Sequence, residues 1–110
     1  MNDLNSVILE GRLTAEPEVG YEDTGRAVCR FVIASKRYHR VDDKYEEEIS
    51  HFGIVVHDRL AEICHENLHE QSGVRVVGRL RAETCGALKK ARPVVIRAEH
   101  IEFKPEKRKG

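Results

Sequence analysis

Hydrophobic residues recur at every second position in several short segments of this chain, a pattern typical of β-strands that bury one face. The first two such segments are Asn5–Thr14 and Arg26–Lys36, separated by a short Pro-Glu segment and an Asp-Thr-Gly turn. Gly11 stands in the middle of the first segment. Because glycine weakens a strand, its presence there indicates a sharp bend or a bulge.

The same alternation predicts three further strands, at Tyr45–His57, Val74–Ala82 and Pro93–Phe103. Gly78 repeats in the fourth strand the mid-strand glycine of the first. In the fifth strand the hydrophobic positions change phase, which predicts a β-bulge near Glu99.

The residues between the third and fourth strands have helical spacing instead. We expect a helix over Arg59–Glu70 with Asp58 as its N-cap. Its apolar stripe consists of Leu60, Ile63, Cys64 and Leu68. The polar residues 37–44 are expected to form a loop. This order of elements favours an all-β fold, a five-stranded Greek-key OB-fold barrel with one α-helix between strands 3 and 4.

The composition of the 110 residues, 40% hydrophobic and 35% charged, is that of a soluble protein with one small core. We expect residues 1–103 to form one domain and the basic tail, residues 104–110, to be flexible. No run is long and apolar enough to cross a membrane, and the start lacks the basic region of a secretory signal. Three cysteines without a CxxC pair favour a reducing, cytoplasmic location.

The formal net charge is zero, from 19 basic and 19 acidic residues, which by itself gives no attraction for a polyanion. The charges are nevertheless segregated along the chain. Basic residues cluster at positions 26–40 and 75–81, and an acidic block lies between them at positions 42–48. Local patches of this kind attract a nucleic acid even when the total charge is neutral.

The chain resembles the bacterial single-stranded DNA-binding protein family in four segments, in this order: VILEGRLTAEPEVGY, TGRAVCRFVIAS, HDRLAEI and SGVRVVGRLR. The resemblance covers roughly Asn5 to Phe103. It implies the OB-fold barrel, binding of single-stranded DNA with little sequence preference in replication, repair or recombination, and a homo-oligomer. A tetramer is usual in the family, and a dimer is the alternative.

The chain departs from this family at the residues that stack on bases. Members of the family use three tryptophans and a phenylalanine, whereas this chain has no tryptophan. The resemblance places His39 (beside Tyr38), His51 and Cys85 at the tryptophan positions and His57 at the phenylalanine position. Imidazole stacks on a base with less area than indole, so we expect weaker binding unless arginines compensate.

Basic residues on the outward face of the strands, together with these histidines, form the predicted nucleic-acid site. Arg59 and Arg81 match basic positions of the family, whereas Glu83 stands where a basic residue is expected. Because histidine titrates near neutral pH, we expect binding to strengthen as the pH falls toward about 6. The predicted nucleic-acid-binding residues are Arg30, Lys36, Arg37, Tyr38, His39, Arg40, His51, His57, Arg59, Arg79 and Arg81.

Two other functions are compatible with the sequence. The chain also resembles primosomal replication protein N, a shorter, normally dimeric relative without the acidic tip that ends typical family members; this chain ends in PEKRKG. The third interpretation is a barrel that has lost nucleic acid and serves only as an interaction module.

An enzyme, a cofactor and a metal site are not expected. The sequence has no nucleophile elbow, P-loop or GxGxxG motif. His65 and His69 have the i, i+4 spacing that can hold zinc, but a solvated helix face is the preferred interpretation.

Overall fold

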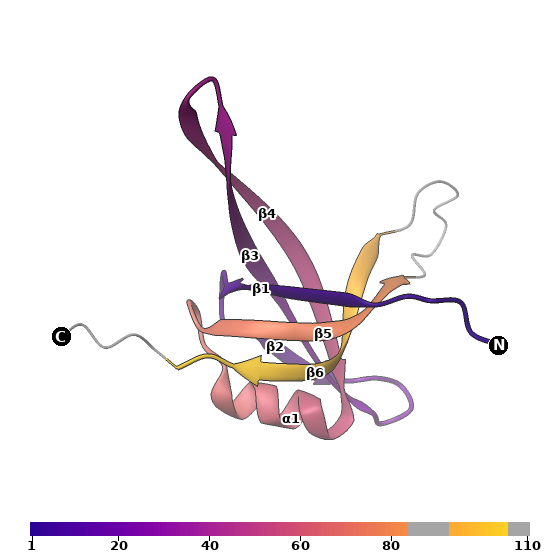
Figure 1. Cartoon of the computed structure of the whole chain (residues 1–110). Helices are drawn as coiled ribbons and strands as arrows, with labels where there is room; N and C mark the ends of the chain where they lie inside the picture. Colours follow the sequence, from indigo (N-terminus) through magenta and orange to yellow (C-terminus); the bar gives the residue numbers. More distant parts are fainter. Residues whose placement is uncertain (84–92, 106–110) are drawn as a thin grey trace.

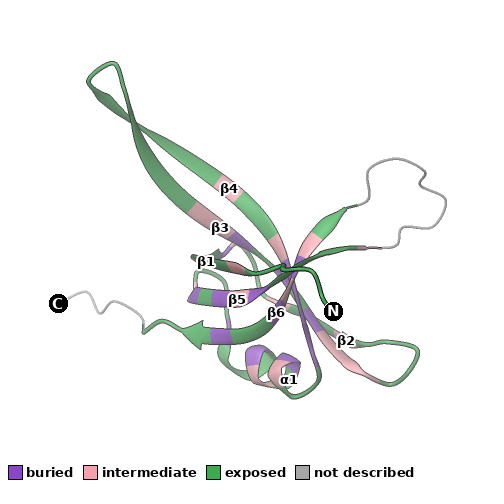
Figure 2. Ribbon diagram, turned by 45° about the vertical axis from the view of Figure 1, so that its right-hand side comes forward, coloured by how far each residue is buried: buried purple, intermediate pink, exposed green. Residues whose placement is uncertain are grey.

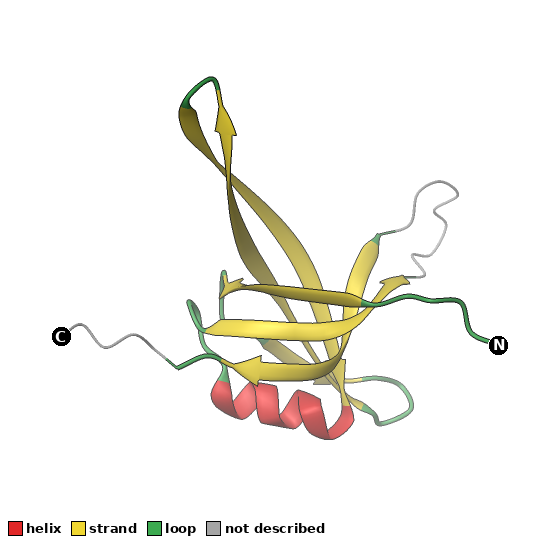
Figure 3. Ribbon diagram, in the orientation of Figure 1, coloured by secondary structure: helices red, strands yellow, loops and turns green. Residues whose placement is uncertain are grey.

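The computed structural model describes residues 1–83 and 93–105 of the chain. Strands dominate these residues, and a helix packs against them (Figures 1 and 3). The elements, in chain order, are β1 (Val7–Leu13), β2 (Glu18–Tyr21), β3 (Ala27–Val41), β4 (Lys44–His57), α1 (Asp58–Asn67), β5 (Gly73–Ala82) and β6 (Val94–Phe103). In the two described ranges, no helix is long and apolar enough to span a membrane.

Five of the strands close into a barrel. The hydrogen-bonded order is β1-β5-β6-β4-β3-β2, and β1 also pairs with β3 through Arg12↔Ala34 and Leu13↔Ile33, which completes the circle. The pairing of β4 with β6 is parallel, and the other pairings are antiparallel. The predicted barrel, with a helix between its third and fourth strands, is confirmed. β2 is a short additional strand on β3 that the sequence pattern did not predict.

Gly11 and Gly78 lie where two backbones approach each other closely. A Cβ atom at Gly11 would lie 2.5 Å from the carbonyl oxygen of Ala34 on β3. A Cβ atom at Gly78 would overlap the carbonyl oxygen of Arg97 on β6. Only a residue without a side chain fits at either position. The register of β1 with β5 has no shift at Gly11, so the structure shows a close approach of backbones there and not the predicted bulge.

The register between β5 and β6 shifts beside Gly78. Val77 pairs with His100, whereas Gly78 pairs with Ala98, so Glu99 is left without a partner on β5. An unpaired extra residue of this kind is a β-bulge, and it bends the strand that carries it. The bulge predicted near Glu99 is confirmed.

The core fills the barrel and continues to the helix that covers one end of it. α1 buries Ala61 and Cys64 against this end, and Leu68, which follows the helix, is also buried (Figure 2). Leu60 packs partly buried against the same core. Other buried apolar side chains, drawn from every barrel strand, include Leu13, Ile33, Ile54, Val56, Val74, Val76 and Ile96.

Residues 37–44 do not form the predicted loop. β3 continues to Val41 and β4 begins at Lys44, so the two strands form a long twisted hairpin that projects from the barrel (Figure 1). Asp42 and Asp43 form its turn with φ angles of 48° and 66°, the positive values that a type I′ turn requires. The prediction failed because both faces of this part of the hairpin are exposed, and hydrophobic alternation is then absent.

The helix begins at Asp58 and is not capped by it. The N-cap residue is His57, which makes no side-chain hydrogen bond to the helix. The Asp58 carboxylate instead accepts hydrogen bonds from Arg26. The helix ends at Asn67, before the predicted end at Glu70.

The spacing of His65 and His69 does not produce a pair on one helix face. His69 lies beyond the end of α1, and its Nδ1 is 3.2 Å from an oxygen of Glu16. Among the described residues there is no group of three or more side chains that would hold a metal ion.

Candidate nucleic-acid interface

The register between β3 and β4 decides which of the predicted residues share a face. Residues directly opposite each other in an antiparallel pair point to the same side of the sheet. The pairs on the outer face include Arg30↔Val55, Ala34↔His51, Lys36↔Ile49, Tyr38↔Glu47 and Arg40↔Tyr45, although Val55 itself is covered and only 2% exposed. The residues that alternate with them on β3, Cys29, Phe31 and Ile33, are buried in the core. The structure therefore brings five of the predicted residues together on one face, from β3 and from His51 of β4.

Arg37 and His39 lie on the other face of the same hairpin. Arg37 is opposite Glu48, and His39 is opposite Glu46. The Nε2 atom of His39 is 3.7 Å from a carboxylate oxygen of Glu46. The structure thus separates these two predicted residues from Tyr38, because successive side chains of a strand point to opposite sides.

Tyr45 lies beside Tyr38 on the outer face, and the sequence-based site omitted it. Tyr45 is opposite Arg40, so the two tyrosines are diagonal neighbours on adjacent strands. Tyr38 is 62% exposed and Tyr45 is 75% exposed. The hydroxyl of Tyr38 donates a hydrogen bond of 2.8 Å to Glu47, which raises the pKa of Tyr38. Both rings are free to take a stacking partner.

Arg97 extends the outer face across β6 to β5. Val55 of β4 pairs with Arg97, and Arg97 pairs with Arg79. Partial burial, and then the charges of Arg26, Arg79 and Arg81, lower the pKa of Arg97. The guanidinium groups therefore gather on one side of the barrel. We call this set the arginine cluster: Arg26, Arg30, Arg79, Arg81 and Arg97.

Arg97 was missing from the sequence-based site, although a signal for it was present. It stands between Ile96 and Ala98, which are the inward residues of β6. Strand alternation alone therefore points Arg97 outward. What the sequence did not give is its position next to Arg79, because that depends on the pairing of β5 with β6.

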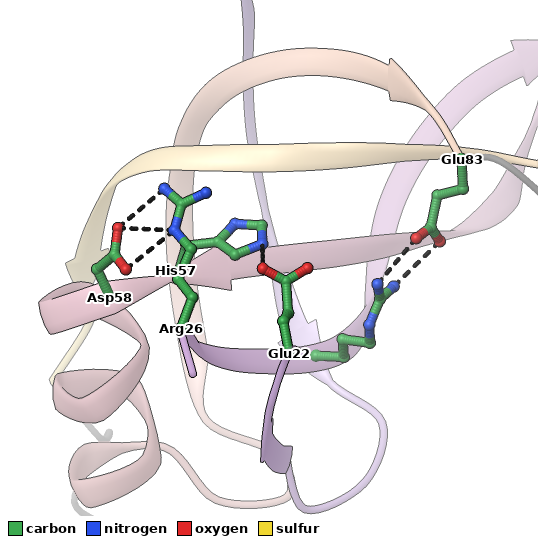
Figure 4. Close-up of polar contacts among 6 residues, drawn as sticks. Glu22, Arg26, His57, Asp58 and Glu83 are labelled. Carbon is green, nitrogen blue, oxygen red and sulfur yellow. Dashed lines mark hydrogen bonds and ion pairs between the residues drawn. The ribbon is translucent and has the colours of Figure 1, made fainter. Parts of the chain in front are cut away.

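Carboxylates hold two members of the arginine cluster. Arg30 donates from Nη1 and Nη2 to the two oxygens of Glu83, at 3.0 and 2.8 Å. Arg26 donates from Nε and Nη2 to Asp58, at 3.0 and 2.9 Å (Figure 4). Each arginine holds the pKa of its carboxyl partner below the usual range, chiefly through these hydrogen bonds.

His57 is buried, which corrects the prediction that it faces solvent. The residue is 8% exposed, and its Nε2 lies 3.5 Å from an oxygen of Glu22, which follows β2 (Figure 4). Its Nδ1 has no hydrogen-bond partner among the described residues. Burial first, and then the charge of Arg97, lower the pKa of His57, so the imidazole is neutral at about pH 7. The sequence did not indicate this burial, because Glu22 is distant in the chain.

Arg59 and Cys85 complete the predicted set of contact positions. Arg59 lies on α1 and not on the sheet, and its Nη1 is 3.1 Å from an oxygen of Glu62. Cys85 falls outside the described residues, as does the tail from residue 106 onward.

Comparisons with known proteins cover nearly the whole chain. Residues 4–104 match the Single-strand binding protein family. The single-stranded DNA-binding protein of Treponema pallidum is 40% identical over 81 residues, which are 74% of this chain and 46% of that protein. Single-stranded DNA-binding protein 2 of Chlorobaculum tepidum is 34% identical over 114 residues, with 100% of this chain and 77% of that protein covered.

A solved structure gives the same result for the fold. The crystal structure of the wild-type single-stranded DNA binding protein from Thermus aquaticus superimposes with a TM-score of 0.81 and 27% identity, over 93% of this chain and 50% of that one. The chain spans about half the length of the Treponema and Thermus proteins. The family resemblance of the four sequence segments is confirmed, and the chain belongs to the Single-strand binding protein family.

Proposed function

We propose that this chain binds single-stranded DNA with little sequence preference, in replication, repair or recombination. The observation that carries the proposal is one outer face that runs from the arginine cluster on the barrel, past His51, along the β3–β4 hairpin to Tyr38 and Tyr45. Guanidinium groups bind phosphates without reading bases, and exposed aromatic rings stack on any base. Such binding needs no catalytic group, in keeping with a family described by binding.

Without tryptophan, stacking in this chain falls to tyrosine and histidine. Base stacking on aromatic side chains contributes about 1–3 kcal/mol per base, and smaller rings give the lower part of this range. The arginine cluster must then supply a large share of the affinity. We therefore infer that binding is strongly salt-dependent, because each phosphate that is neutralised releases counterions from the strand.

The proposal is tested by titrating a fluorescent oligo-dT and following its anisotropy over a series of salt concentrations. We expect the logarithm of the association constant to fall linearly with the logarithm of salt, by about 0.7 for each neutralised phosphate. The combined substitution Arg79→Gln, Arg81→Gln and Arg97→Gln is expected to weaken binding at least about tenfold and to reduce the slope by about 2.

Arg75→Gln is the matched control, because Arg75 is also an outward arginine of β5 but is engaged by Glu10 and Glu102. It should leave the affinity within about twofold of the unsubstituted chain. A chain that does not bind oligo-dT even at low salt contradicts the proposal and favours the interaction module.

A homo-oligomer in the cytoplasm is part of the proposal, with a tetramer favoured over a dimer. β1 pairs with β5 along its length but meets β3 only at Arg12 and Leu13, which leaves a free strand edge in the described structure. Ile8 on this strand is 69% exposed. Light scattering distinguishes the alternatives. A tetramer agrees with the favoured function, and a dimer favours an accessory protein similar to primosomal replication protein N.

A further inference from the structure

The arginines of the cluster form two groups, which differ in whether they have a carboxylate partner. Arg26 and Arg30 are engaged by Asp58 and Glu83. In the described part of the chain, no ion pair joins Arg79, Arg81 or Arg97 to a carboxylate. One part is therefore open to an anionic ligand, whereas the other already binds anionic groups of the chain itself.

The contact between Arg30 and Glu83 has the geometry in which arginine grips a phosphate. Two nitrogens of one guanidinium donate to two oxygens of one anion, at 3.0 and 2.8 Å. Parallel donation of this kind is how arginine binds carboxylates and phosphates alike. A phosphate of a bound strand and the carboxylate of Glu83 thus need the same donor atoms of Arg30.

Glu83 is held in position by its backbone. Its N–H donates a hydrogen bond of 2.9 Å to the carbonyl oxygen of Pro93, across the point where β5 ends and β6 begins. Arg30 reaches it from β3, and the two side chains, with Arg81 and His57, line a cavity of about 210 Å³. The carboxylate therefore stands within the outer face and not at its edge.

We propose that Glu83 competes with nucleic-acid phosphate for Arg30, so that a single strand gains this arginine only by displacing the carboxylate. The proposal rests on the proposed function, because it assumes a bound strand on this face. Glu83 then lowers the affinity, and within the arginine cluster the uncontested contacts are those of Arg79, Arg81 and Arg97. The side chains of Arg30 and Glu83 are 46% and 29% exposed, so water and salt can reach the pair and the exchange is open to a ligand.

Glu83→Gln removes the competing charge and keeps the shape of the side chain. We expect it to strengthen oligo-dT binding roughly two- to fivefold, the upper part of the range for loss of one partly exposed charge pair. The salt slope should steepen by about 0.7, because Arg30 now neutralises a phosphate. Glu102→Gln is the matched control: it removes the same charge from β6, beside Arg75, and should change the affinity less than about twofold.

Combining Glu83→Gln with Arg30→Gln distinguishes direct competition for Arg30 from a general change of the electric field. In an Arg30→Gln background, Glu83→Gln should have almost no effect on the affinity, because the arginine for which it competes is gone. An equal gain in both backgrounds, or no gain in the otherwise unchanged chain, overturns the proposal. Thermal melting confirms that each variant is folded, and Glu83→Ser repeats the test with a smaller neutral side chain.

The outcomes for the two proposals are distinct. If the unsubstituted chain does not bind oligo-dT, the proposed function fails and the competition fails with it. If the chain binds with the expected salt dependence but Glu83→Gln is no tighter, binding stands and only the role of Glu83 is overturned.

Discussion

Single residues set the geometry of this barrel where two strands touch. Gly11 and Gly78 stand against carbonyl oxygens of neighbouring strands, and neither position has room for a methyl group. His57 is a different kind of single-residue feature, because a titratable ring is buried there and one of its nitrogens has no partner within residues 1–83 and 93–105. Each feature has a measurable cost when it is changed.

Gly78→Ala should destabilise the fold by about 3 kcal/mol, because the new Cβ forces the β5 and β6 backbones apart. Gly20→Ala is the control, since nothing lies within 4 Å of a Cβ at that position, and a change below about 0.5 kcal/mol is expected. Urea unfolding followed by circular dichroism measures both. Similar losses for the two variants would show that the close contact at Gly78 does not matter.

His57 should make the fold sensitive to acid. The pKa of His57 in the folded chain lies below its ordinary value of 6.5, which applies to the unfolded chain. At a pH between the folded pKa and 6.5, the unfolded chain therefore binds more protons than the folded chain. The stability contributed by the neutral ring is fully present above about pH 6.5 and is lost as the pH falls toward the folded pKa. The charged groups facing it are Glu22, Arg26 and Arg97, and desolvation outweighs the favourable effect of Glu22.

His57→Phe removes this titration and keeps a ring in the space. Thermal melts from about pH 8 to pH 5 should show a smaller loss of Tm on acidification for the variant than for the unsubstituted chain. Parallel curves would contradict the assignment. The lowered pKa also means that His57 contributes less to the expected gain in binding at acidic pH than an exposed histidine would.

At the scale of elements, the β3–β4 hairpin is the main addition to the barrel. Its two faces carry different chemistry, because Tyr38 and Tyr45 lie on the outer face and Arg37 and His39 on the other. The hairpin therefore widens the outer face beyond the barrel itself (Figure 1). This difference between the faces can be tested within one element.

Tyr38→Ala and Tyr45→Ala together should weaken oligo-dT binding at least about tenfold, since each lost stacking interaction costs about 1–3 kcal/mol. His39→Ala changes an aromatic ring on the opposite face and is the control, for which we expect less than about a twofold change. Anisotropy at one salt concentration is sufficient. A larger effect from His39 would place the strand on the other face of the hairpin.

The strands that bury one face were predictable, and the hairpin was not. Alternation gave β1, β5, β6 and the barrel end of β4 because each of these segments has a buried side, whereas residues 44–49 of β4 are exposed. The end of β3 has exposed residues on both sides, and its turn is formed by Asp42 and Asp43 without a glycine. Of the site, the outward arginines followed from alternation, whereas the contacts of His57 and Glu83 depend on residues distant in sequence.

At the scale of the whole molecule, zero net charge conceals two different surfaces. On the side formed by β1, β5 and β6, Glu10, Arg75, Glu102 and Lys104 join in ion pairs and cancel one another. Toward the end of β5 and the start of β6, and beside the start of β3, the arginine cluster instead holds more positive groups than its carboxylates neutralise. Total charge is therefore a poor guide to what this chain binds.

Ile8→Asp should lower the mass of the proposed oligomer, because it places a charge on the free edge of β1. Val94→Asp is the control, since Val94 is 58% exposed at the end of β6 and not on this edge. Light scattering should show subunits from the first variant and an unchanged assembly from the second. Unchanged mass for both would exclude the β1 edge as the contact between copies.

The strand order has a consequence for synthesis on the ribosome. β6 lies between β5 and β4 in the sheet, although it is the last strand in the chain. β1 is the first strand, but its main partner is β5, with pairs such as Val7↔Gly78, so it has no such partner until β5 has been made. A nascent chain therefore exposes unpaired strand edges until Phe103 has left the exit tunnel, and such edges are prone to aggregate. Before β5 is made, only the pairings of β3 with β1, β2 and β4 can form, so the barrel closes after almost all of residues 1–103 have been translated.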